Sequence, residues 1–261
     1  MRSPLILLTN DDGVESRCLA AAADALSPLG DVWVYAPDRN QSGVGHGVSL
    51  HRPLRVRQVR ERWFSVDGTP TDCVMLAVRD LLRARPDIVV SGINNGPNMG
   101  DDVTYSGTVA GAFEGMLLGL PSIAVSSTSH DPQHIHDSAR AMAEIARFVL
   151  NNGVPRDTVL NVNIPDLPFE ELQGIRSTRM GRRTYEDEII RREDPRGVSY
   201  YWIGGDSPGH VHDTGTDFAA IDEKCISVTP LHRDLTNYEA LAVLDKFDVS
   251  SAVPAKQTAT T

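Results

Sequence analysis

The sequence predicts an α/β fold of the Rossmann-like, doubly wound type, with a mainly parallel sheet and a C-terminal β-hairpin arm. Apolar runs of four to seven residues, typical of buried strands, alternate with amphipathic helical patterns through most of the chain. The first apolar run, at residues 5–8, is followed closely by the adjacent carboxylates Asp11 and Asp12. A buried strand that ends in polar residues is typical of the sheet edge where open α/β folds keep their chemistry.

The elements of the predicted core follow in order along the chain. Strands are expected from short β-prone runs, and helices from apolar spacing, caps and the prolines and glycines that end them. Strands are expected at residues 5–9, 32–36, 87–91, 121–127 and 159–164, and helices at residues 15–27, 73–82, 109–118 and 134–150. Residues 48–59 contain Pro53, which favours an edge hairpin with residues 63–66 as its partner.

After residue 173 the pattern changes, and we expect an appendage to the core. Residues 181–197 are charged with both signs and have no apolar stripe, so this segment is a mixed face and no basic patch. An aromatic β-prone run at 198–203 follows, and a short strand and a helix close the chain. The expected division is a catalytic core at 1–173, an arm with a closing helix at 174–249, and a disordered tail at 250–261.

Composition limits the classes of function. The net charge of −10 over 261 residues argues against a protein that follows polyanionic nucleic acid with its surface. No apolar run approaches the roughly 20 residues that a membrane span needs, and no signal-peptide pattern is present, so we expect a cytoplasmic protein. Cys18, Cys73 and Cys225 are far apart and odd in number, and we interpret them as small buried side chains.

Oxygen-bearing side chains recur after several predicted strands, beginning with Asp11 and Asp12. Gly13 permits the sharp turn that lets both carboxylates serve one ion, although neighbouring residues on a regular strand point to opposite faces. The glycine-rich segment 37–47 lacks both the Walker lysine and the dinucleotide-binding pattern. Carboxylate, hydroxyl and amide oxygens suit Mg²⁺, Mn²⁺ or Ca²⁺ better than a structural zinc site.

Each candidate outside the aspartate pair also has an ordinary structural interpretation. Ser42 is a hydroxyl ligand or a turn residue, and Asn94 and Asn98 are ligands or members of a long turn. The run from Ser106 through Gly107 to Thr108 opens a helix, so it is either a phosphate-binding site or a plain N-cap. Their recurrence in successive βα units of one sheet favours the functional interpretation.

His210 and His212 are a separate candidate. Their spacing places two imidazoles on one side of an extended segment, where they can bind a metal. The sequence offers no third nitrogen or sulfur ligand nearby, so this site stays an alternative to an ordinary loop.

Several long motifs resemble the SurE family of survival proteins, which are metal-dependent nucleoside monophosphate phosphatases. The matching stretches are LLTNDDG, APDRNQSG, GTPTDC, PDIVVSGINNGPNMGDDVTYSGTVAGA, DPRGVSYYWIGG and GTDFAAIDEKCISVTPLHRDLT. The resemblance implies one divalent cation per subunit, Mg²⁺ or Mn²⁺, with ligands at Asp11, Asp12, Ser42 and Asn94. It also implies an α/β core whose extended arm exchanges between the subunits of a homodimer or homotetramer.

The expected function is hydrolysis of nucleoside 5′-monophosphates, with 3′-monophosphates and short polyphosphate as secondary substrates. Asp11 or Asp12 orients or deprotonates the attacking water, while the helix start and Asn98 hold the phosphoryl oxygens. The segment with Gly43 and His46 is the candidate substrate loop, and it departs from the family pattern after Ser42. The alternative function is a non-catalytic nucleotide-binding or sensing protein, which has little use for two adjacent carboxylates. Neither membrane nor stable nucleic-acid partners are expected.

Overall fold

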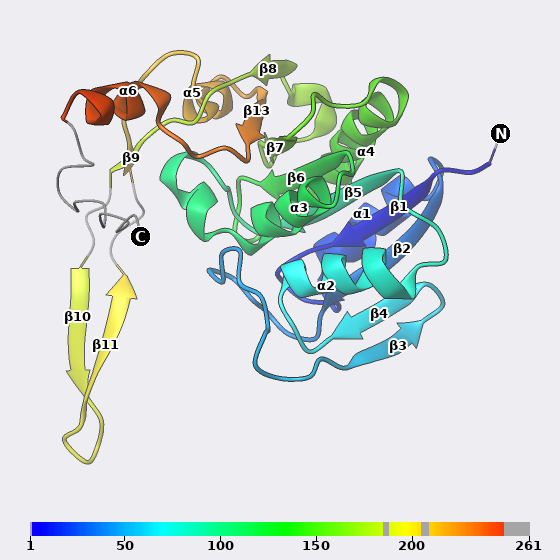
Figure 1. Ribbon diagram of the computed structural model, residues 1–261, viewed down its shortest axis with the longest axis horizontal. Coiled ribbons are helices and arrows are strands. Elements are labelled where there is room, and N and C mark those ends of the chain that lie inside the picture. Colours follow the sequence, from blue (N-terminus) through cyan, green and yellow to red (C-terminus); the bar gives the residue numbers. More distant parts are fainter. Residues whose placement is uncertain (1, 185–187, 205–208, 248–261) are drawn as a thin grey trace, which may run out of the picture. The chain divides into compact units, whose positions relative to one another are not determined.

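The computed structural model describes residues 2–184, 188–204 and 209–247 and divides into two compact units, Met1–Leu231 and His232–Thr261. The first unit is built on a nine-stranded sheet (Figure 1). From edge to edge its strands are β3 (Val56–Arg60), β4 (Trp63–Val66), β2 (Asp31–Pro37), β1 (Leu5–Thr9), β5 (Ile88–Asn94), β6 (Ser122–Ser127), β7 (Thr158–Ile164), β13 (Ile226–His232) and β8 (Ile175–Ser177). The strands from β4 to β7 are parallel to one another, and β3 runs antiparallel to β4.

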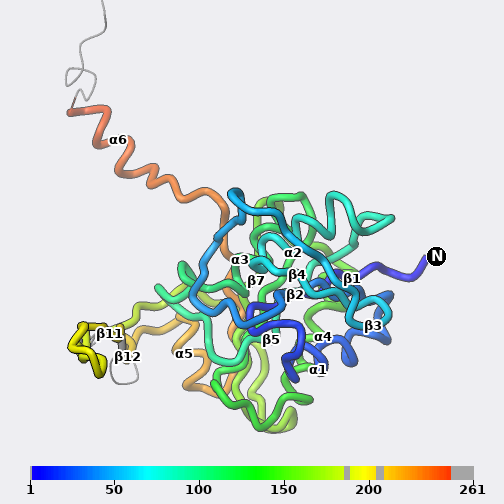
Figure 2. The backbone as a smooth tube through the Cα atoms, turned by 90° about the horizontal axis from the view of Figure 1, so that it is seen from below, coloured from blue at the N-terminus to red at the C-terminus, as the bar shows by residue number. Residues whose placement is uncertain are grey.

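Helices cover both faces of the sheet. On one face α1 (Arg17–Leu26) packs against α4 (Ile135–Asn152), which can be followed in Figures 1 and 2. On the other face α2 (Pro70–Leu76) packs against α3 (Gly107–Leu117), and α2 continues as a π-helical turn, Ala77–Leu81. The alternation of β1 explains both layers: Ile6 and Leu8 join the core beneath α1 and α4, whereas Leu7 joins the core beneath α2. The predicted doubly wound α/β fold is confirmed.

The strand order places β1 at the centre of the polar edge. From β1 the chain continues to β2 on one side, and it returns to β5 on the other side. The register pairs Thr9 of β1 with Ser91 of β5, so the residues that follow these strands meet at one edge of the sheet. Such a topological switch point leaves a crevice at the carboxyl ends of the strands.

The sheet extends beyond the expected core boundary at residue 173. Both β8 and β13 join it, and β13 continues through Pro230 to His232, three residues past its expected end at Thr229. The reason is packing: Ile226 belongs to the main hydrophobic core, and Val228 packs against it. The first compact unit therefore extends to Leu231. The predicted tail at 250–261 lies outside the described residues.

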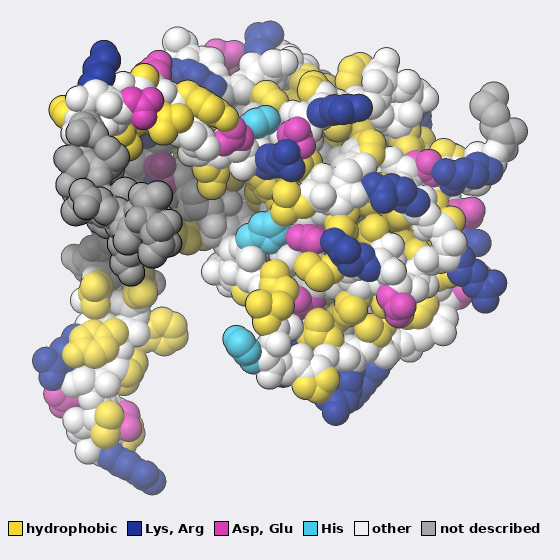
Figure 3. All heavy atoms as spheres, in the orientation of Figure 1, with side chains coloured by type: hydrophobic (Ala, Val, Ile, Leu, Met, Phe, Trp, Pro, Cys, Tyr) yellow, Lys and Arg dark blue, Asp and Glu magenta, His cyan; other side chains and the backbone are white. Residues whose placement is uncertain are grey.

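Between β8 and β13 the chain forms the predicted hairpin, which we call the hairpin arm. It consists of β10 (Glu188–Glu193) and β11 (Ser199–Gly204), which pair antiparallel with each other. At its base the short strands β9 (Arg183–Thr184) and β12 (Gly209–His210) also pair antiparallel. Hydrophobic side chains are exposed along the hairpin arm (Figure 3).

Short helices complete the two units. The first unit contains the 3₁₀ helices Gly100–Tyr105 and Phe169–Glu171 and the α-helix α5 (Asp217–Asp222), whose N-cap is Thr216. The second unit contains α6 (Tyr238–Lys246), which begins after the N-cap Asn237 and confirms the expected closing helix. None of the helices in the described ranges is both long enough and apolar enough to cross a membrane.

Candidate metal centre and phosphate pocket

A polar pocket of about 360 Å³, the strand-end pocket, lies where β1, β2 and β5 give way to loops. Six of the site residues predicted from the sequence line it, namely Asp11, Ser42, Gly43, Asn94, Asn98 and Ser106. The residues that line it are Asp11, Ser42, Gly43, Asn94, Asn95, Pro97, Asn98, Asp102, Tyr105, Ser106, His130 and Arg183. These residues come from six different segments of the chain, so the pocket exists only in the folded unit.

The turn after β1 holds Asp11 at the floor of the pocket. Gly13 has φ +102°, a backbone conformation that strains any residue with a side chain. A Cβ at this position would also lie only 3.1 Å from the carbonyl carbon of Arg39, so both the conformation and the close approach favour glycine. The backbone N–H of Gln41 donates to the carbonyl oxygen of Asp11 at 2.7 Å. The turn after β1 and the loop after β2 are thus bonded directly to each other.

Asp11 is held from the other side by the start of α3. Its Oδ1 accepts the Thr108 hydroxyl at 2.5 Å, and its Oδ2 accepts the Thr108 backbone N–H at 3.0 Å. Thr108 is fully buried, so it faces Asp11 and does not line the pocket. A Cβ on Gly107 would lie 2.9 Å from the Cβ of Asp11, which explains a glycine at this approach. Thr108 therefore bonds Asp11, whereas the sequence predicted a contact between Thr108 and the substrate phosphate.

The two carboxylates lie in an environment that raises the pKa of both, although His130 acts in the opposite direction on Asp12. Burial is the largest cause that raises the pKa of both, and the charge of Asp11 helps to raise the pKa of Asp12 to about 6. In the part of the chain that the structure describes, no arginine or lysine forms an ion pair with either one. Asp12 Oδ2 accepts the backbone N–H of Asn95 at 3.2 Å. A cation at this position would relieve the repulsion between the carboxylates.

Ser42 and Asn94 add neutral oxygens to the same pocket. The backbone N–H of Ser42 donates to Asn40 Oδ1 at 2.7 Å, which fixes the turn that presents the serine. The amide nitrogen of Asn94 donates to the carbonyl oxygen of Gly96 at 2.8 Å, which leaves the amide oxygen as its ligand atom. Two carboxylates, a hydroxyl and an amide oxygen form a donor set that fits a hard divalent cation such as Mg²⁺ or Mn²⁺.

Asn98 is fixed by a buried polar network. Its backbone N–H donates to Asn163 Oδ1, and its carbonyl oxygen accepts the amide groups of Asn161 and Asn163, all within 2.8–3.0 Å. Its side-chain amide donates to Ser126 Oγ at 2.8 Å. Since an amide nitrogen carries two N–H groups, the second one is available for a ligand in the pocket.

The remaining predicted site residues divide into two groups. Ser106 is the N-cap of α3, where its Oγ accepts the N–H of Val109 at 3.0 Å, and it also lines the pocket. The N-cap interpretation of Ser106 is therefore confirmed, and its place in the pocket lining is compatible with a contact to a ligand. Gly43 lines the pocket, whereas His46 lies outside its lining and contacts Glu114 of α3, with His46 Nε2 at 3.3 Å from Glu114 Oε2.

Asn95 links Asp12 to neighbouring elements, and the sequence did not identify it. Besides its N–H bond to Asp12, its side-chain oxygen accepts the Cys18 thiol at 3.0 Å, and its carbonyl oxygen accepts His130 Nδ1 at 3.2 Å. Burial and the nearby charge of Asp12 raise the pKa of Cys18 to about 11, so the thiol stays protonated as a donor.

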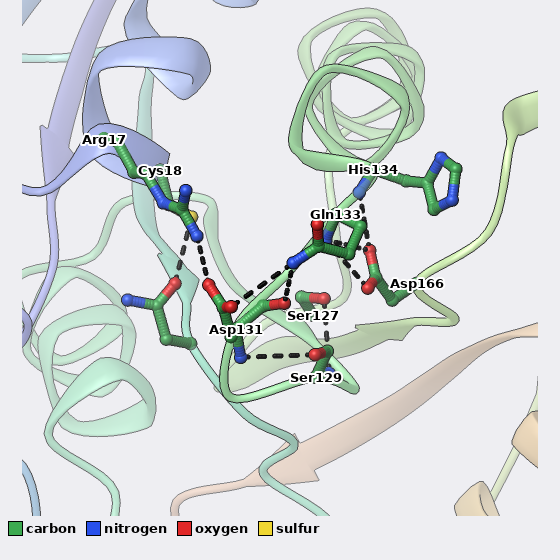
Figure 4. Close-up of polar contacts among 9 residues, drawn as sticks. Arg17, Cys18, Ser127, Ser129, Asp131, Gln133, His134 and Asp166 are labelled. Carbon is green, nitrogen blue, oxygen red and sulfur yellow. Dashed lines mark hydrogen bonds and ion pairs between the residues drawn. The ribbon is translucent and has the colours of Figure 1, made fainter.

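His130, also missed, belongs to a loop that is bonded on both sides. In Figure 4 Arg17 reaches Asp131 from α1, while Asp166 faces Gln133 and His134. The backbone N–H groups of Gln133 and His134 donate to the Asp166 carboxylate at 2.9 and 2.8 Å. This loop therefore presents His130 to the pocket from a fixed backbone, which local sequence patterns do not reveal.

Arg183 brings the base of the hairpin arm into the pocket wall. Its Nε lies 2.6 Å from Asp102 Oδ2, and its side chain is only 10% exposed. Nearby, the buried carboxylate of Asp217 accepts the backbone N–H groups of Gly100 and Gly181, both at 2.8 Å. The pocket and the base of the arm are therefore joined by side-chain hydrogen bonds.

The chain matches the family model described as Survival protein SurE over residues 6–187. Among curated proteins, it is 53% identical over 250 residues to a protein of Geobacter sulfurreducens named 5′-nucleotidase SurE, covering 95% of each chain. It is 48% identical to the protein of the same name from Aquifex aeolicus, covering 91% of this chain and 96% of that one. The crystal structure of the Sure protein from Aquifex aeolicus superimposes with a TM-score of 0.83 at 45% identity, over 94% of this chain and 99% of that chain.

Proposed function

This chain belongs to the SurE family, and we propose that it is a metal-dependent phosphatase that hydrolyses nucleoside 5′-monophosphates to nucleoside and phosphate. The observation that carries the proposal is the adjacent pair Asp11, which lines the strand-end pocket, and Asp12, which lies outside the lining and accepts the N–H of the lining residue Asn95. Both have a raised pKa, and neither is paired with an arginine or lysine in the described ranges. We propose one Mg²⁺ or Mn²⁺ per subunit at Asp11, Asp12, Ser42 and Asn94.

The bound cation would act as a Lewis acid on a phosphoryl oxygen and would supply an acidified water. The carboxylates of Asp11 and Asp12 hold this centre and orient the attacking water. Thr108 keeps Asp11 in one rotamer through its N–H and hydroxyl groups, so it is a positioning residue.

The phosphoryl oxygens would be held by donors on the pocket wall. We assign this role to the side-chain amide of Asn98 and to Ser106 at the start of α3, both of which line the pocket, together with the neighbouring Gly107. The backbone N–H groups of Ser106, Thr108 and Val109 already donate to Val103, Asp11 and the Ser106 hydroxyl, so the positive end of the helix dipole is what this helix start adds. Thr108, at the same helix start, bonds Asp11 and does not line the pocket. A monoester fits such a site better than a polymer backbone, because it offers more free oxygens and the net charge of −10 repels a long polyanion. Monophosphates at the 3′ position and short polyphosphate are proposed as secondary substrates.

We also propose that the hairpin arm assembles the chain into a homodimer or homotetramer. Trp202 and Ile203 on β11 are 63% and 86% exposed, and Ile189 on β10 is 70% exposed. A two-stranded ribbon with apolar side chains exposed on both faces is marginal in water by itself, so a second copy of the chain is the expected cover.

Release of inorganic phosphate tests the proposed reaction. Metal-stripped protein is incubated with 5′- and 3′-monophosphates, a dinucleotide and polyphosphate, each with and without Mn²⁺ or Mg²⁺. Metal-dependent release from 5′-monophosphates supports the proposal, and excess chelator should abolish it. Nucleotide binding without release would indicate the binding or sensing protein instead, and cleavage of the dinucleotide alone would contradict the substrate class.

A further inference from the structure

The base of the hairpin arm contains a second cluster of ligand-type side chains outside the strand-end pocket. His210 belongs to β12, whose antiparallel pairing aligns His210 with Arg183 of β9. The backbone N–H of Val211 donates to the carbonyl oxygen of Arg182 at 3.0 Å, so the segment stays extended after His210. Residues two apart on an extended segment point to the same side. His210 and His212 therefore share one side of this segment.

A third ligand reaches the two imidazoles from α5. Asp222 is the last residue of that helix, and its Oδ2 lies 3.1 Å from Nε2 of His210. One ligand atom from each of His210, His212 and Asp222 lies within 4.8 Å of the other two. The sequence had suggested the histidine pair but offered no nitrogen or sulfur partner, whereas the fold supplies a carboxylate.

One imidazole of the cluster is held in a defined plane. The ring of His210 stacks on Phe218 with centroids 4.6 Å apart and an interplanar angle of 6°, and Phe218 is only 2% exposed. The His212 ring meets the His210 ring edge to face, at a centroid distance of 4.9 Å. Two ligands of the cluster can adjust, because His212 is exposed and the Asp222 side chain is 53% exposed.

The distances suit a small transition-metal ion. With bonds of about 2.0–2.2 Å, two ligand atoms around a tetrahedral Zn²⁺ lie about 3.4 Å apart. The His210 and Asp222 atoms are already at 3.1 Å, and rotation of the two exposed side chains closes the remaining distance. The hollow in front of them, of about 290 Å³, is also lined by Asp213 and Glu223. Asp213 and Glu223 form ion pairs with Arg179 and Arg176, so Asp222 is the carboxylate of this hollow that faces the imidazoles and favours a cation there.

We propose that His210, His212 and Asp222 form a second metal site, selective for a borderline transition-metal ion such as Zn²⁺, Co²⁺ or Ni²⁺. Its two nitrogens and one carboxylate oxygen differ from the oxygen donors of the strand-end pocket, so the two sites prefer different metals. Three protein ligands leave a coordination position for water.

Occupancy of the second site would tie the base of the hairpin arm to α5. Arg183, the cross-strand neighbour of His210, contacts Asp102 in the wall of the strand-end pocket. A metal at the second site would therefore restrain the backbone that presents Arg183, without contact to the substrate.

Cobalt titration tests this site directly. Untagged, metal-stripped full-length protein is first saturated with Mg²⁺, which occupies the oxygen site, and Co²⁺ is then added while the visible absorption is recorded. We expect one further equivalent of Co²⁺ per chain, with the intense bands of four- or five-coordinate cobalt. The same signal should persist in the Asp11→Asn variant, because that substitution alters only the oxygen site.

Two substitutions and one matched control assign the signal. His212→Ala and Asp222→Asn should each weaken Co²⁺ binding more than about tenfold, since each removes a ligand. Both positions are substantially exposed, so we expect the variants to fold, and their thermal melting is measured as the check. The control is His136→Ala, because His134 and His136 have the same spacing but lie at the start of α4, where no described trio forms.

Three results would overturn the proposal. These are the absence of the Co²⁺ equivalent expected in the presence of saturating Mg²⁺, equal Co²⁺ binding by wild type and His212→Ala, or an equal loss of Co²⁺ binding in His136→Ala. Any of them would leave His210 and Asp222 as an ordinary ion pair.

Discussion

In the strand-end pocket polar side chains are buried and bonded to nearby backbone, whereas on the hairpin arm apolar side chains are exposed to water. Asp11 is 3% exposed, and both of its carboxylate oxygens accept hydrogen bonds from Thr108. Trp202 on the arm is 63% exposed. The pocket is thus organised around two carboxylates that form no ion pair with an arginine or lysine of the described residues, while the arm exposes large apolar side chains. The carboxylate charge of the pocket supports the proposed cation. The exposed apolar area of the arm supports the proposed second copy of the chain.

The largest effect is expected from removal of a charge in the pocket. Asp11→Asn should lower kcat/KM by about 10³-fold, because the centre loses a buried anionic ligand. The measurement is phosphate release from a 5′-monophosphate with saturating Mn²⁺. Asp24→Asn, which alters an exposed aspartate on α1, is the control and should behave as wild type. Near wild-type turnover of Asp11→Asn would mean that the metal centre lies elsewhere.

A smaller effect should follow from loosening Asp11 without removing its charge. Thr108→Val deletes the 2.5 Å hydroxyl contact and keeps the backbone N–H, so activity should fall about tenfold. The Mg²⁺ concentration for half-maximal activity should rise as well, which a purely structural role would not cause. Thr104→Val, in the exposed 3₁₀ turn before α3, is the matched control. An unchanged metal requirement in Thr108→Val would refute the positioning role.

On the hairpin arm the expected change is a loss of assembly, which lowers the measured molecular mass by a factor of two or more. Trp202→Glu combined with Ile203→Glu places charge where a second copy should pack, so light scattering should show a mass near 28.4 kDa. Phe148→Glu changes a residue that is 61% exposed on α4 and should leave the assembly intact. If the wild-type chain itself has the monomer mass at micromolar concentration, the arm does not serve assembly.

The smallest effect concerns the stability of the metal-free protein. The pKa of Asp12 is raised from 3.8 to about 6, so the folded state binds the proton more tightly than the unfolded chain does. The stability that this group contributes is fully present below about pH 4, and it is lost as the pH rises through about 6. Asp12→Asn removes this loss. The melting temperature of the metal-stripped variant should therefore fall less between pH 5 and pH 7.5 than that of wild type.

Addition of Mg²⁺ provides the control for this comparison. The ion should raise the melting temperature of wild type at pH 7.5 by more than that of Asp12→Asn, because a ligand that binds only the folded state stabilises it. An identical dependence on pH in both proteins would mean that Asp12 does not carry the raised pKa.

The fold and the centre of the pocket could be predicted because their signals are local. An apolar run followed by Asp11 and Asp12 indicates a buried strand with carboxylates at its end, and glycine beside these residues indicates a turn. The prediction for Thr108 rested on the tendency of a helix N-terminus with hydroxyl side chains to bind an anion. Its actual partner, Asp11, is 97 residues away in the sequence, and only the folded sheet shows the contact.

Other residues, in the pocket lining or in the polar network that fixes Asn98, were missed for related reasons. Asn161 and Asn163 alternate within an otherwise apolar strand, and this pattern is a signal for a buried polar network that could have been used. Arg183 lies in a segment whose mixed charges suggested only a solvated face. The boundary at residue 173 differs from the observed sheet because β8 is only three residues long and because the pairing of β8 and β13 to the sheet has no local signature.

The hydrogen bonds of Asp217 also bear on how the protein is made. Its carboxylate bonds the backbone of Gly100, 117 residues earlier in the chain, and the carboxylate is fully buried. Chains leave the ribosome from the N-terminus, and their domains fold as units as they emerge. A nascent chain that has exposed only the first strands of the sheet cannot yet make this bond. The loop from Gly100 onward therefore acquires its final anchor only late in synthesis, so premature termination anywhere before residue 217 should yield a chain with an incomplete pocket.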